Sequence, residues 1–180
     1  MIAGVARGRR LTAPAGLHAR PTSDRVREAL FSMLDSHLGG LDDLRVADLA
    51  CGSGALGIEA LSRGAAACTF VDTSPVSLRA ARANLVAVGL EAALGSFVKD
   101  DIFRWARRLE PGSFDLVLAD PPYAWDGWPD LLDALAGAAV TVAAESDRAI
   151  EPTSGWASRR ERRHGGTVLS VLVADRDPKP

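Results

Sequence analysis

Between residues 44 and 139, short apolar runs alternate with segments of helical periodicity, and this alternation limits the folds that the chain can adopt. Strands are expected at 44–49, 67–71, 96–99 and 114–119. Helices are expected at 55–63, 74–88, 102–109 and 131–139. The run 114–119 is apolar throughout, which is typical of a strand buried on both faces. Repeated strand–helix units predict a mainly parallel, doubly wound sheet with right-handed crossovers.

The last part of the chain departs from this alternation. A fifth strand is expected at 148–151, and the segments 156–163 and 167–174 are expected to pair as an antiparallel hairpin through Gly165 and Gly166. No helix separates these last two strands, unlike in a plain dinucleotide-binding fold. The sequence therefore predicts an α/β fold with a seven-stranded, mainly parallel sheet.

The first 40 residues form an expected extension that precedes the sheet. Residues 1–12 alternate small apolar side chains with Gly and Arg, which favours a short β-hairpin. After a proline-containing loop, a helix is expected to begin next to an N-cap at Thr22 or Ser23. We therefore divide the chain into a basic N-terminal extension over 1–40, hairpin plus helix, and a larger domain over 41–180.

A glycine-rich loop follows the first strand of the sheet. Residues 52–57 spell GxGxxG, in which glycines allow the backbone to approach a bulky cofactor. The pattern alone does not separate NAD, FAD and S-adenosylmethionine, because all three use such a loop. For S-adenosylmethionine, Asp48 on the preceding strand would attract the ammonium and sulfonium charges. Asp72 ends the second strand and is placed to accept the ribose hydroxyls.

The residue next to the adenine stays open between two neighbours. Asp101 follows the third strand, where it could accept the adenine amino group, and Asp100 is an equal candidate by register. Either carboxylate could instead cap the next helix. The predicted cofactor-binding residues are Asp48, Ala50, Cys51, Gly52, Ser53, Gly54, Asp72, Thr73, Asp101 and Ile102.

The tetrapeptide Asp120-Pro121-Pro122-Tyr123 closes the fourth strand and distinguishes these cofactors. A nicotinamide enzyme has no need of it, whereas an enzyme that methylates a planar amine does. If the Asp120 carboxylate and the Pro121 carbonyl accept the two N–H groups of an exocyclic base amine, the nitrogen lone pair can localise toward the cofactor methyl. The prolines fix φ and remove backbone donors. Tyr123 offers a ring on which an extruded base can stack, worth about 1–3 kcal/mol. We therefore predict that these four residues are catalytic, chiefly by positioning.

The charge distribution favours a polyanionic substrate. The net charge is −2, yet residues 1–27 hold six arginines against one aspartate, which gives +5 there and −7 on the remainder. A second basic run covers 159–163. Clustered arginine on an otherwise acidic protein indicates a local footprint for a polyanion. Whether the run at 159–163 faces this polyanion is left open by the sequence.

Four stretches of the sequence resemble the RsmD family of 16S ribosomal RNA (guanine-N2) methyltransferases. They are 4–11, 20–31, 48–64 and the tetrapeptide at 120–123, and the similarity covers nearly the whole length. The stretch 20–31 (RPTSDRVREALF) is far more specific than the glycine loop. The chain departs from the family pattern in three places: at Ala50-Cys51, where an aromatic residue and Ala are usual, at Asp72, where Glu is commoner, and at His164-Gly165-Gly166-Thr167, where Tyr-Gly-Asp/Asn-Thr is frequent.

This resemblance implies a class I methyltransferase fold, which is Rossmann-like, with S-adenosylmethionine bound by the domain over 41–180. It implies methyl transfer to the N2 amine of one guanine, at position 966 of 16S rRNA, in the small ribosomal subunit or its assembly intermediate. Phosphate contacts would orient the RNA, and the guanine would have to be unstacked to reach the pocket. The predicted RNA-binding residues are Arg7, Arg9, Arg10, Arg20, Thr22, Arg25 and Arg27.

Three other functions stay open at this point. A DNA methyltransferase acting on adenine N6 or cytosine N4 would use the same acceptor geometry, although no separate target-recognition domain fits in 180 residues. An enzyme that methylates protein glutamine usually carries Asn in place of Asp120. A non-catalytic RNA-binding module would not need an intact Asp48, intact glycines and Asp120.

The remaining composition excludes several classes of protein. The two cysteines, Cys51 and Cys68, provide no disulfide framework, and no Cys/His cluster has metal-ligand spacing, so no metal is expected. No apolar run approaches the ~20 residues that span a bilayer. We expect a cytoplasmic protein, active as a monomer, with no membrane partner.

Overall fold

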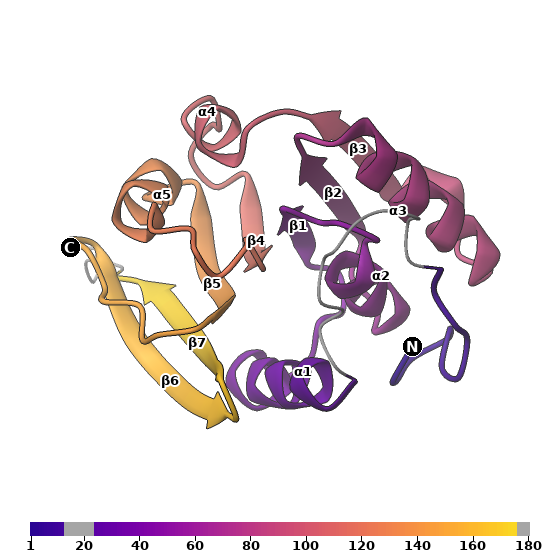
Figure 1. The fold of residues 1–180 in the computed structure, drawn as a ribbon, viewed down its shortest axis with the longest axis horizontal. Helices are drawn as coiled ribbons and strands as arrows, with labels where there is room; N and C mark the ends of the chain where they lie inside the picture. Colours follow the sequence, from indigo (N-terminus) through magenta and orange to yellow (C-terminus); the bar gives the residue numbers. More distant parts are fainter. Residues whose placement is uncertain (13–23, 176–180) are drawn as a thin grey trace.

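The computed structural model describes residues 1–12 and 24–175 and contains one seven-stranded sheet (Figure 1). The strand order is β3-β2-β1-β4-β5-β7-β6. Strands β1 to β5 pair in parallel, whereas β7 is antiparallel to both β5 and β6. The strands are β1 (Arg45–Leu49), β2 (Ala67–Asp72), β3 (Gly95–Lys99), β4 (Phe114–Ala119), β5 (Ala139–Ser146), β6 (Trp156–His164) and β7 (Thr167–Ala174). The predicted α/β fold with a mainly parallel, doubly wound sheet is confirmed.

Helices cover both faces of this sheet (Figure 1). One core cluster joins the sheet to α1 (Asp24–Leu38), α2 (Ala55–Ser62) and α3 (Pro75–Ala87). The other joins it to α4 (Ile102–Ala106) and α5 (Trp128–Leu135). A 3-10 turn, η1 (Ala92–Leu94), precedes β3. Because strand residues alternate between faces, neighbours such as Val117 and Leu118 enter opposite clusters.

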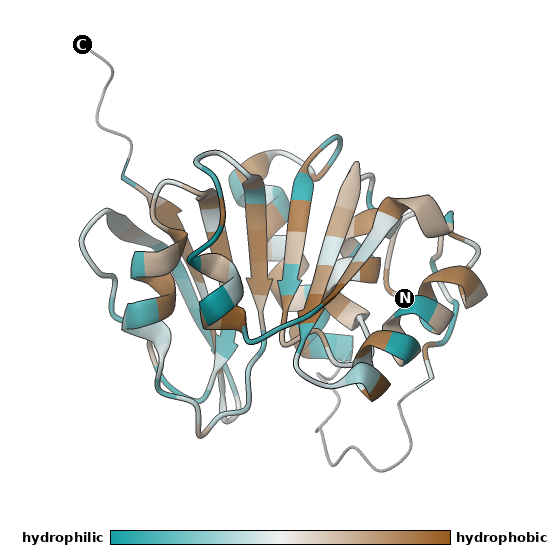
Figure 2. Ribbon diagram, turned by 90° about the horizontal axis from the view of Figure 1, so that it is seen from above, coloured by the Kyte–Doolittle hydropathy of each residue, from teal (hydrophilic) through white to brown (hydrophobic). Residues whose placement is uncertain are grey.

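The central strands are apolar because both of their faces are buried. Figure 2 shows that hydrophobic residues dominate the middle of the sheet. Residues 116–119 of β4 are all less than 1 % exposed, as the unbroken apolar run predicts. At the far end of the sheet, the Trp156 indole donates to the Leu132 carbonyl at 2.9 Å and fixes β6 against α5.

The expected fifth strand at 148–151 is wrong, since β5 occupies Ala139–Ser146. The expected helix 131–139 ends at Leu135, shortly before Gly137, whose φ of +76° breaks the helical path. Ala139, where the expected helix ends, is the first residue of β5. Residues 140–142, to which no element was assigned, are Val-Thr-Val, and burial between β4 and β7 makes this β-branched segment a strand.

The expected N-terminal β-hairpin is also wrong, because residues 1–12 contain no strand. They form a closed turn in which the Met1 ammonium donates to the Arg9 carbonyl at 2.5 Å and the Gly8 N–H donates to the Met1 carbonyl at 3.0 Å. The N–H groups that a hairpin would pair are taken by α2, as described below. The expected helix is confirmed as α1, and its predicted N-caps, Thr22 and Ser23, lie outside the described residues.

The boundary proposed between 1–40 and 41–180 stays a prediction. Leu30, Phe31 and Leu34 of α1 are fully buried in the core cluster that includes the sheet. In residues 1–12 and 24–175, no helix has both the length and the hydrophobicity needed to cross a membrane.

Candidate active site

A hollow of about 170 Å³ opens at the carboxyl ends of the central strands. It lies where the strand order reverses between β1 and β4, the position at which doubly wound sheets bind ligands. Its lining residues are Ala50, Asp72, Thr73, Asp101, Ile102, Pro121, Pro122 and Trp125. All of these except Trp125 were predicted site residues, so the structure brings together the cofactor and tetrapeptide predictions in one place.

The glycine loop turns sharply between β1 and α2. Ala50, Gly52 and Gly54 have φ values of +55°, +53° and +79°, a left-handed run that favours glycine. A Cβ on Gly54 would lie 2.9 Å from the Cβ of Ala81. The Gly52 N–H donates to Asp72 Oδ2 at 3.0 Å, so the ribose-binding candidate also holds the loop. The loop is therefore shaped by contacts on both of its sides.

Asp48 lies behind this loop and is not among the residues that line the hollow. It is 1 % exposed, and its Oδ2 accepts from the Gly57 N–H at 2.8 Å. Burial raises the pKa of Asp48 well above its ordinary value, and the charges of Asp120 and Asp72 raise it further against the effect of the Gly57 bond. Three carboxylates thus lie close together at the ends of β1, β2 and β4. Such a cluster is stabilised by a cationic ligand.

Two other residues of the loop that were predicted to bind the cofactor, Cys51 and Ser53, make contacts that stabilise the fold. Cys51 is buried, and its N–H donates to the Val71 carbonyl at 3.1 Å. Burial raises the pKa of the Cys51 thiol, which therefore stays protonated and unreactive. The Ser53 carbonyl accepts from the side chain of Asn84 at 2.9 Å.

The Asp100 and Asp101 side chains have different surroundings in the structure. The Asp100 carboxylate is 9 % exposed and is bound by Arg104 Nε at 2.7 Å and by the Arg108 guanidinium. Asp101 lines the hollow, and its Oδ1 caps α4 by accepting from the N–H groups of residues 103 and 104. The geometry therefore favours Asp101 as the residue that faces a ligand.

The tetrapeptide follows the end of β4 and lies beside the hollow. The Asp120 N–H donates to the Leu49 carbonyl at 3.4 Å, and Pro121 and Pro122 form part of the wall. The Tyr123 hydroxyl lies 3.1 Å from Glu145 Oε1 and 2.5 Å from the Thr167 hydroxyl. Burial raises the pKa of Tyr123, so its hydroxyl remains protonated. The tyrosine is thus held at its far end by β5 and β7.

Glu145 and Thr167 are site residues that sequence reasoning missed. Both side chains belong to buried strand residues, and nothing in a single sequence links positions 22 and 44 residues beyond Tyr123. Trp125, which follows the tetrapeptide in the chain, also lines the hollow and packs edge-on against Trp128 at 5.1 Å between ring centroids.

Asn84 is a further missed residue. This residue of α3 is 3 % exposed, and its Oδ1 accepts from the Thr12 N–H at 2.8 Å. Its Nδ2 donates to the Thr12 carbonyl at 3.0 Å and to the Ser53 carbonyl. One amide therefore ties the N-terminal segment to the glycine loop. A buried Asn within an apolar helix face was the available signal.

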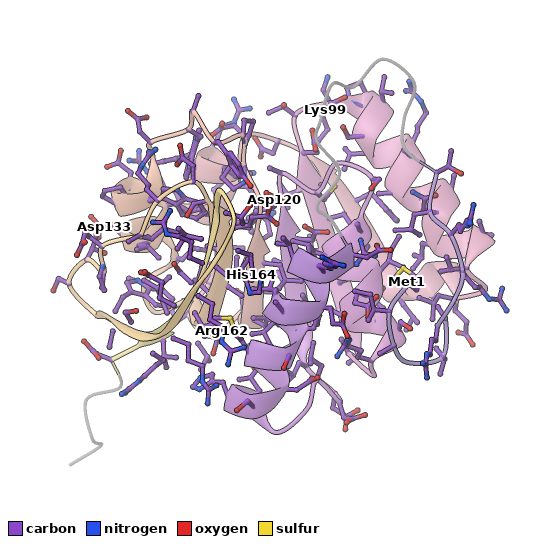
Figure 3. All side chains as sticks on the ribbon, turned by 60° about the horizontal axis from the view of Figure 1, so that its bottom comes forward. Met1, Lys99, Asp120, Asp133, Arg162 and His164 are labelled. Atoms are coloured by element: carbon purple, nitrogen blue, oxygen red, sulfur yellow. The ribbon has the colours of Figure 1, made fainter. Side chains whose placement is uncertain are left out.

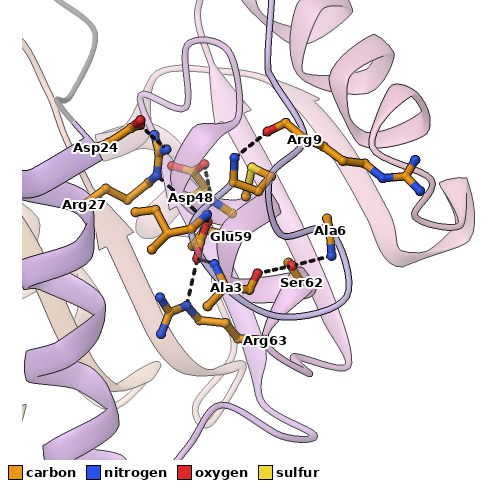
Figure 4. Close-up of polar contacts among 12 residues, drawn as sticks. Ala3, Ala6, Arg9, Asp24, Arg27, Asp48, Glu59, Ser62 and Arg63 are labelled. Atoms are coloured by element: carbon orange, nitrogen blue, oxygen red, sulfur yellow. Dashed lines mark hydrogen bonds and ion pairs between the residues drawn. The ribbon is translucent and has the colours of Figure 1, made fainter.

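The N-terminal segment is held on α2 by the buried Glu59 (Figure 4). Its two carboxylate oxygens accept from the N–H groups of Ile2 at 2.8 Å and Ala3 at 2.9 Å, and Arg63 Nε binds it at 2.9 Å. Gly4 must be glycine here, because a Cβ would lie 1.6 Å from the Ser62 carbonyl oxygen.

The predicted RNA-binding residues fall into three groups. Arg7, Arg9, Arg10 and Arg25 are exposed. Arg20 and Thr22 lie outside the described residues. Arg27 is 6 % exposed, with Nη2 at 2.6 Å from Asp24 and Nε at 4.0 Å from Glu59, so its prediction as an RNA contact is wrong. Its guanidinium faces the interior because it shares a helix face with the buried core residues of α1.

Comparisons with known proteins agree with this geometry. The family model described as conserved hypothetical protein 95 matches residues 1–173. The ribosomal RNA small subunit methyltransferase D of Haemophilus influenzae is 28 % identical over 173 residues, with 92 % of this chain and 88 % of that protein covered. The enzyme of the same name from Escherichia coli is 36 % identical over 124 residues, which cover 68 % of this chain and 59 % of that protein.

YlbH of Bacillus subtilis is 38 % identical over 125 residues, and the match spans 66 % of its length. The solved structure of yhhF from E. coli superposes with a TM-score of 0.81 at 28 % identity and 98 % coverage of both chains. An RNA methyltransferase from Salinibacter ruber, solved with S-adenosyl-L-homocysteine, shares the fold at 20 % identity, a TM-score of 0.66 and coverage of 89 % of this chain and 98 % of that one. The chain therefore belongs to the conserved hypothetical protein 95 family, that of the RsmD-type methyltransferases.

Proposed function

We propose that this chain transfers a methyl group from S-adenosylmethionine to the N2 amine of a guanine in 16S rRNA of the small ribosomal subunit. The observation that carries the proposal is the placement of Asp120 to Tyr123 beside the hollow at the sheet's switch point. This arrangement sets the tetrapeptide next to the residues that are predicted to bind the cofactor. The names of the relatives, ribosomal RNA small subunit methyltransferase D, support the choice of substrate.

The residues of the hollow fit S-adenosylmethionine, the methyl donor of this family. Asp72 and Asp101 stand at the ends of neighbouring strands, where they would bind the ribose and the adenine. Ile102 and Trp125 contribute apolar side chains to the wall of the hollow. The cluster of Asp48, Asp72 and Asp120 would stabilise the ammonium and sulfonium charges.

The bound cofactor supplies a methyl group activated by its sulfonium. The chain's own contribution is to position the amine. The Asp120 carboxylate and the Pro121 carbonyl accept the two N–H groups, so the nitrogen lone pair no longer conjugates fully with the guanine ring. Asp120 is also placed to take the proton that the nitrogen loses as the new N–C bond forms.

Tyr123 supplies the surface on which the guanine stacks. Because its hydroxyl is bound by Glu145 and Thr167, the ring is fixed before the base arrives. Preorganisation of this kind lowers the entropic cost of binding. The exposed arginines Arg7, Arg9, Arg10 and Arg25 would contact phosphates. We further infer that the enzyme acts as a monomer in the cytoplasm, where ribosomal subunits assemble.

The proposal is tested with labelled S-adenosylmethionine and small subunits that lack the modification. We expect label in N2-methylguanosine of 16S rRNA, at position 966 as in the RsmD family. Label confined to adenine or cytosine of DNA, or to protein, would contradict the proposal and support one of the alternatives. Asp120→Ala should lose methyl transfer and retain S-adenosylmethionine affinity, and full activity in this variant would overturn the amine-acceptor role.

A further inference from the structure

We propose that Arg160, Arg162 and His164 of β6 form a second RNA-binding surface, which contacts phosphates next to the guanine held by Tyr123. This inference rests on the proposed function, because it assumes that the substrate is the RNA proposed there. It concerns the basic run whose orientation the sequence left open. The three residues are called the β6 row below.

The β6 row lies on the free edge of the sheet. β6 pairs with β7 on one side, and its other side ends the strand order. Residues 158–164 are all exposed. Within the described residues, neither Arg160 nor Arg162 has an acidic partner. Unpaired arginines on an accessible strand are suited to bind phosphate oxygens.

The register of β6 decides which way each arginine points. Arg160, Arg162 and His164 pair with Val171, Leu169 and Thr167 of β7. Cross-strand partners project on the same face of a sheet, and Leu169 and Val171 belong to the core cluster beneath α1, α2 and α3. The β6 row therefore lies on that face.

A β-bulge creates this alignment. The register shifts between Ser158 and Arg160. Before the shift, Trp156 and its partner Ala174 belong to the opposite core cluster. The extra residue moves the even-numbered positions onto the other face. Arg163, which pairs with Val168, is left pointing away from the β6 row.

The β6 row leads to the tetrapeptide. His164 pairs with Thr167, and the Thr167 hydroxyl binds the Tyr123 hydroxyl at 2.5 Å. Figure 3 shows Arg162, His164 and Asp120 one after another across the molecule. Successive same-face residues of a strand are about 6–7 Å apart, a spacing comparable with that of neighbouring phosphates on a nucleic-acid strand. RNA whose base stacks on Tyr123 would pass along this row.

Protection of an edge strand does not account for these charges. Charged residues of either sign prevent edge-to-edge pairing, so a mixture would serve. Two arginines on one face without an acidic neighbour repel each other. A polyanion removes this repulsion, and the opposite face carries Glu161 beside Arg163.

The test compares two adjacent arginines with opposite orientations. Arg162→Gln and Arg163→Gln remove the same charge from exposed positions of one strand, so both variants should fold. Binding of the full chain to deproteinised 16S rRNA and to small subunits is measured against salt concentration. A lost phosphate contact makes the negative slope of log K against log salt shallower by about 0.7–0.9. This corresponds to about five- to eightfold weaker binding near 0.1 M salt.

We expect this loss for Arg162→Gln and none for Arg163→Gln. Equal losses in the two variants, or no loss in either, would overturn the proposal. A loss confined to assembled subunits, absent with deproteinised rRNA, would overturn it in favour of a ribosomal-protein partner. Methyl transfer by the wild-type chain is measured in parallel, so a failure of the proposed function is seen separately from a failure of the β6 row.

Discussion

Replacing Glu59 by Gln should destabilise the whole protein, because this carboxylate joins three parts of the chain. It is fully buried and binds two N-terminal backbone N–H groups and the Arg63 guanidinium, with Arg27 at 4.0 Å. Glutamine preserves the shape and removes the charge. Its amide nitrogen must then face an N–H or a guanidinium, so at least one buried donor loses its acceptor.

The expected cost follows from these contacts. Removing one partner of a buried ion pair costs about 3–5 kcal/mol. Arg63 and Arg27 are 13 % and 8 % exposed in their side chains, so water can only partly replace the lost charge. Small domains have a total stability of about 5–15 kcal/mol. The substitution should therefore remove a large share of the free energy of unfolding.

Urea denaturation measures this loss, with the exposed Glu28 of α1 as a matched control. Glu28→Gln should change the free energy of unfolding by about 0.5 kcal/mol at most. Trypsin should also cleave the N-terminal segment of Glu59→Gln faster than that of the control, since the segment loses its anchor. A Glu59→Gln variant within about 1 kcal/mol of wild type would show that the N-terminal segment is not held as described.

Two other predictions concern buried polar groups. Asn84→Ala should cost about 2–3 kcal/mol and weaken S-adenosylmethionine binding, as measured by denaturation and calorimetry, because Ser53 and Thr12 lose their amide partner. Asn84→Asp should be worse than Asn84→Ala, since its carboxylate would face two carbonyl oxygens; an Asp variant as stable as wild type would refute the bonding pattern. Bonds from Arg108 and Arg104 lower the pKa of Asp100 to about 2. Its contribution to stability is therefore present above the unfolded-state pKa of about 3.9 and is lost as the pH falls toward 2. Asp100→Asn should be less stable than wild type near pH 5, and the difference should shrink between pH 4 and 2; a pH-independent difference would contradict this assignment.

Local chemistry made the centre of the site predictable. The glycine loop and Asp120 to Tyr123 are contiguous motifs attached to strand ends, and parallel strands bring their carboxyl ends to one edge. Seven of the residues that line the hollow were therefore among the predicted site residues. The Tyr123 anchor was not predictable in this way, because Glu145 and Thr167 meet only when β7 inserts antiparallel beside β5.

Two wrong predictions have a common cause, which is that composition was given more weight than position. The fifth strand was expected at 148–151, whereas the buried place of 139–146 between two strands makes that segment the strand. Arg27 was counted with the basic surface, although it lies three and four residues before the buried Leu30 and Phe31. That spacing puts it on the inner face of α1. Asp48 holds the glycine loop from behind and does not line the hollow, and its role toward the cofactor stays a prediction.

The bulge in β6 determines which side of the sheet the arginines after it face. If β6 continued the register of Trp156 with Ala174 without a bulge, Arg160 and Arg162 would stand opposite Ser170 and Val168 and would point to the opposite side of the sheet. A slip of this register by one residue would then affect RNA binding more than a change of residue type. Relatives that pair these strands without the bulge would present arginines at these positions to a different part of the RNA.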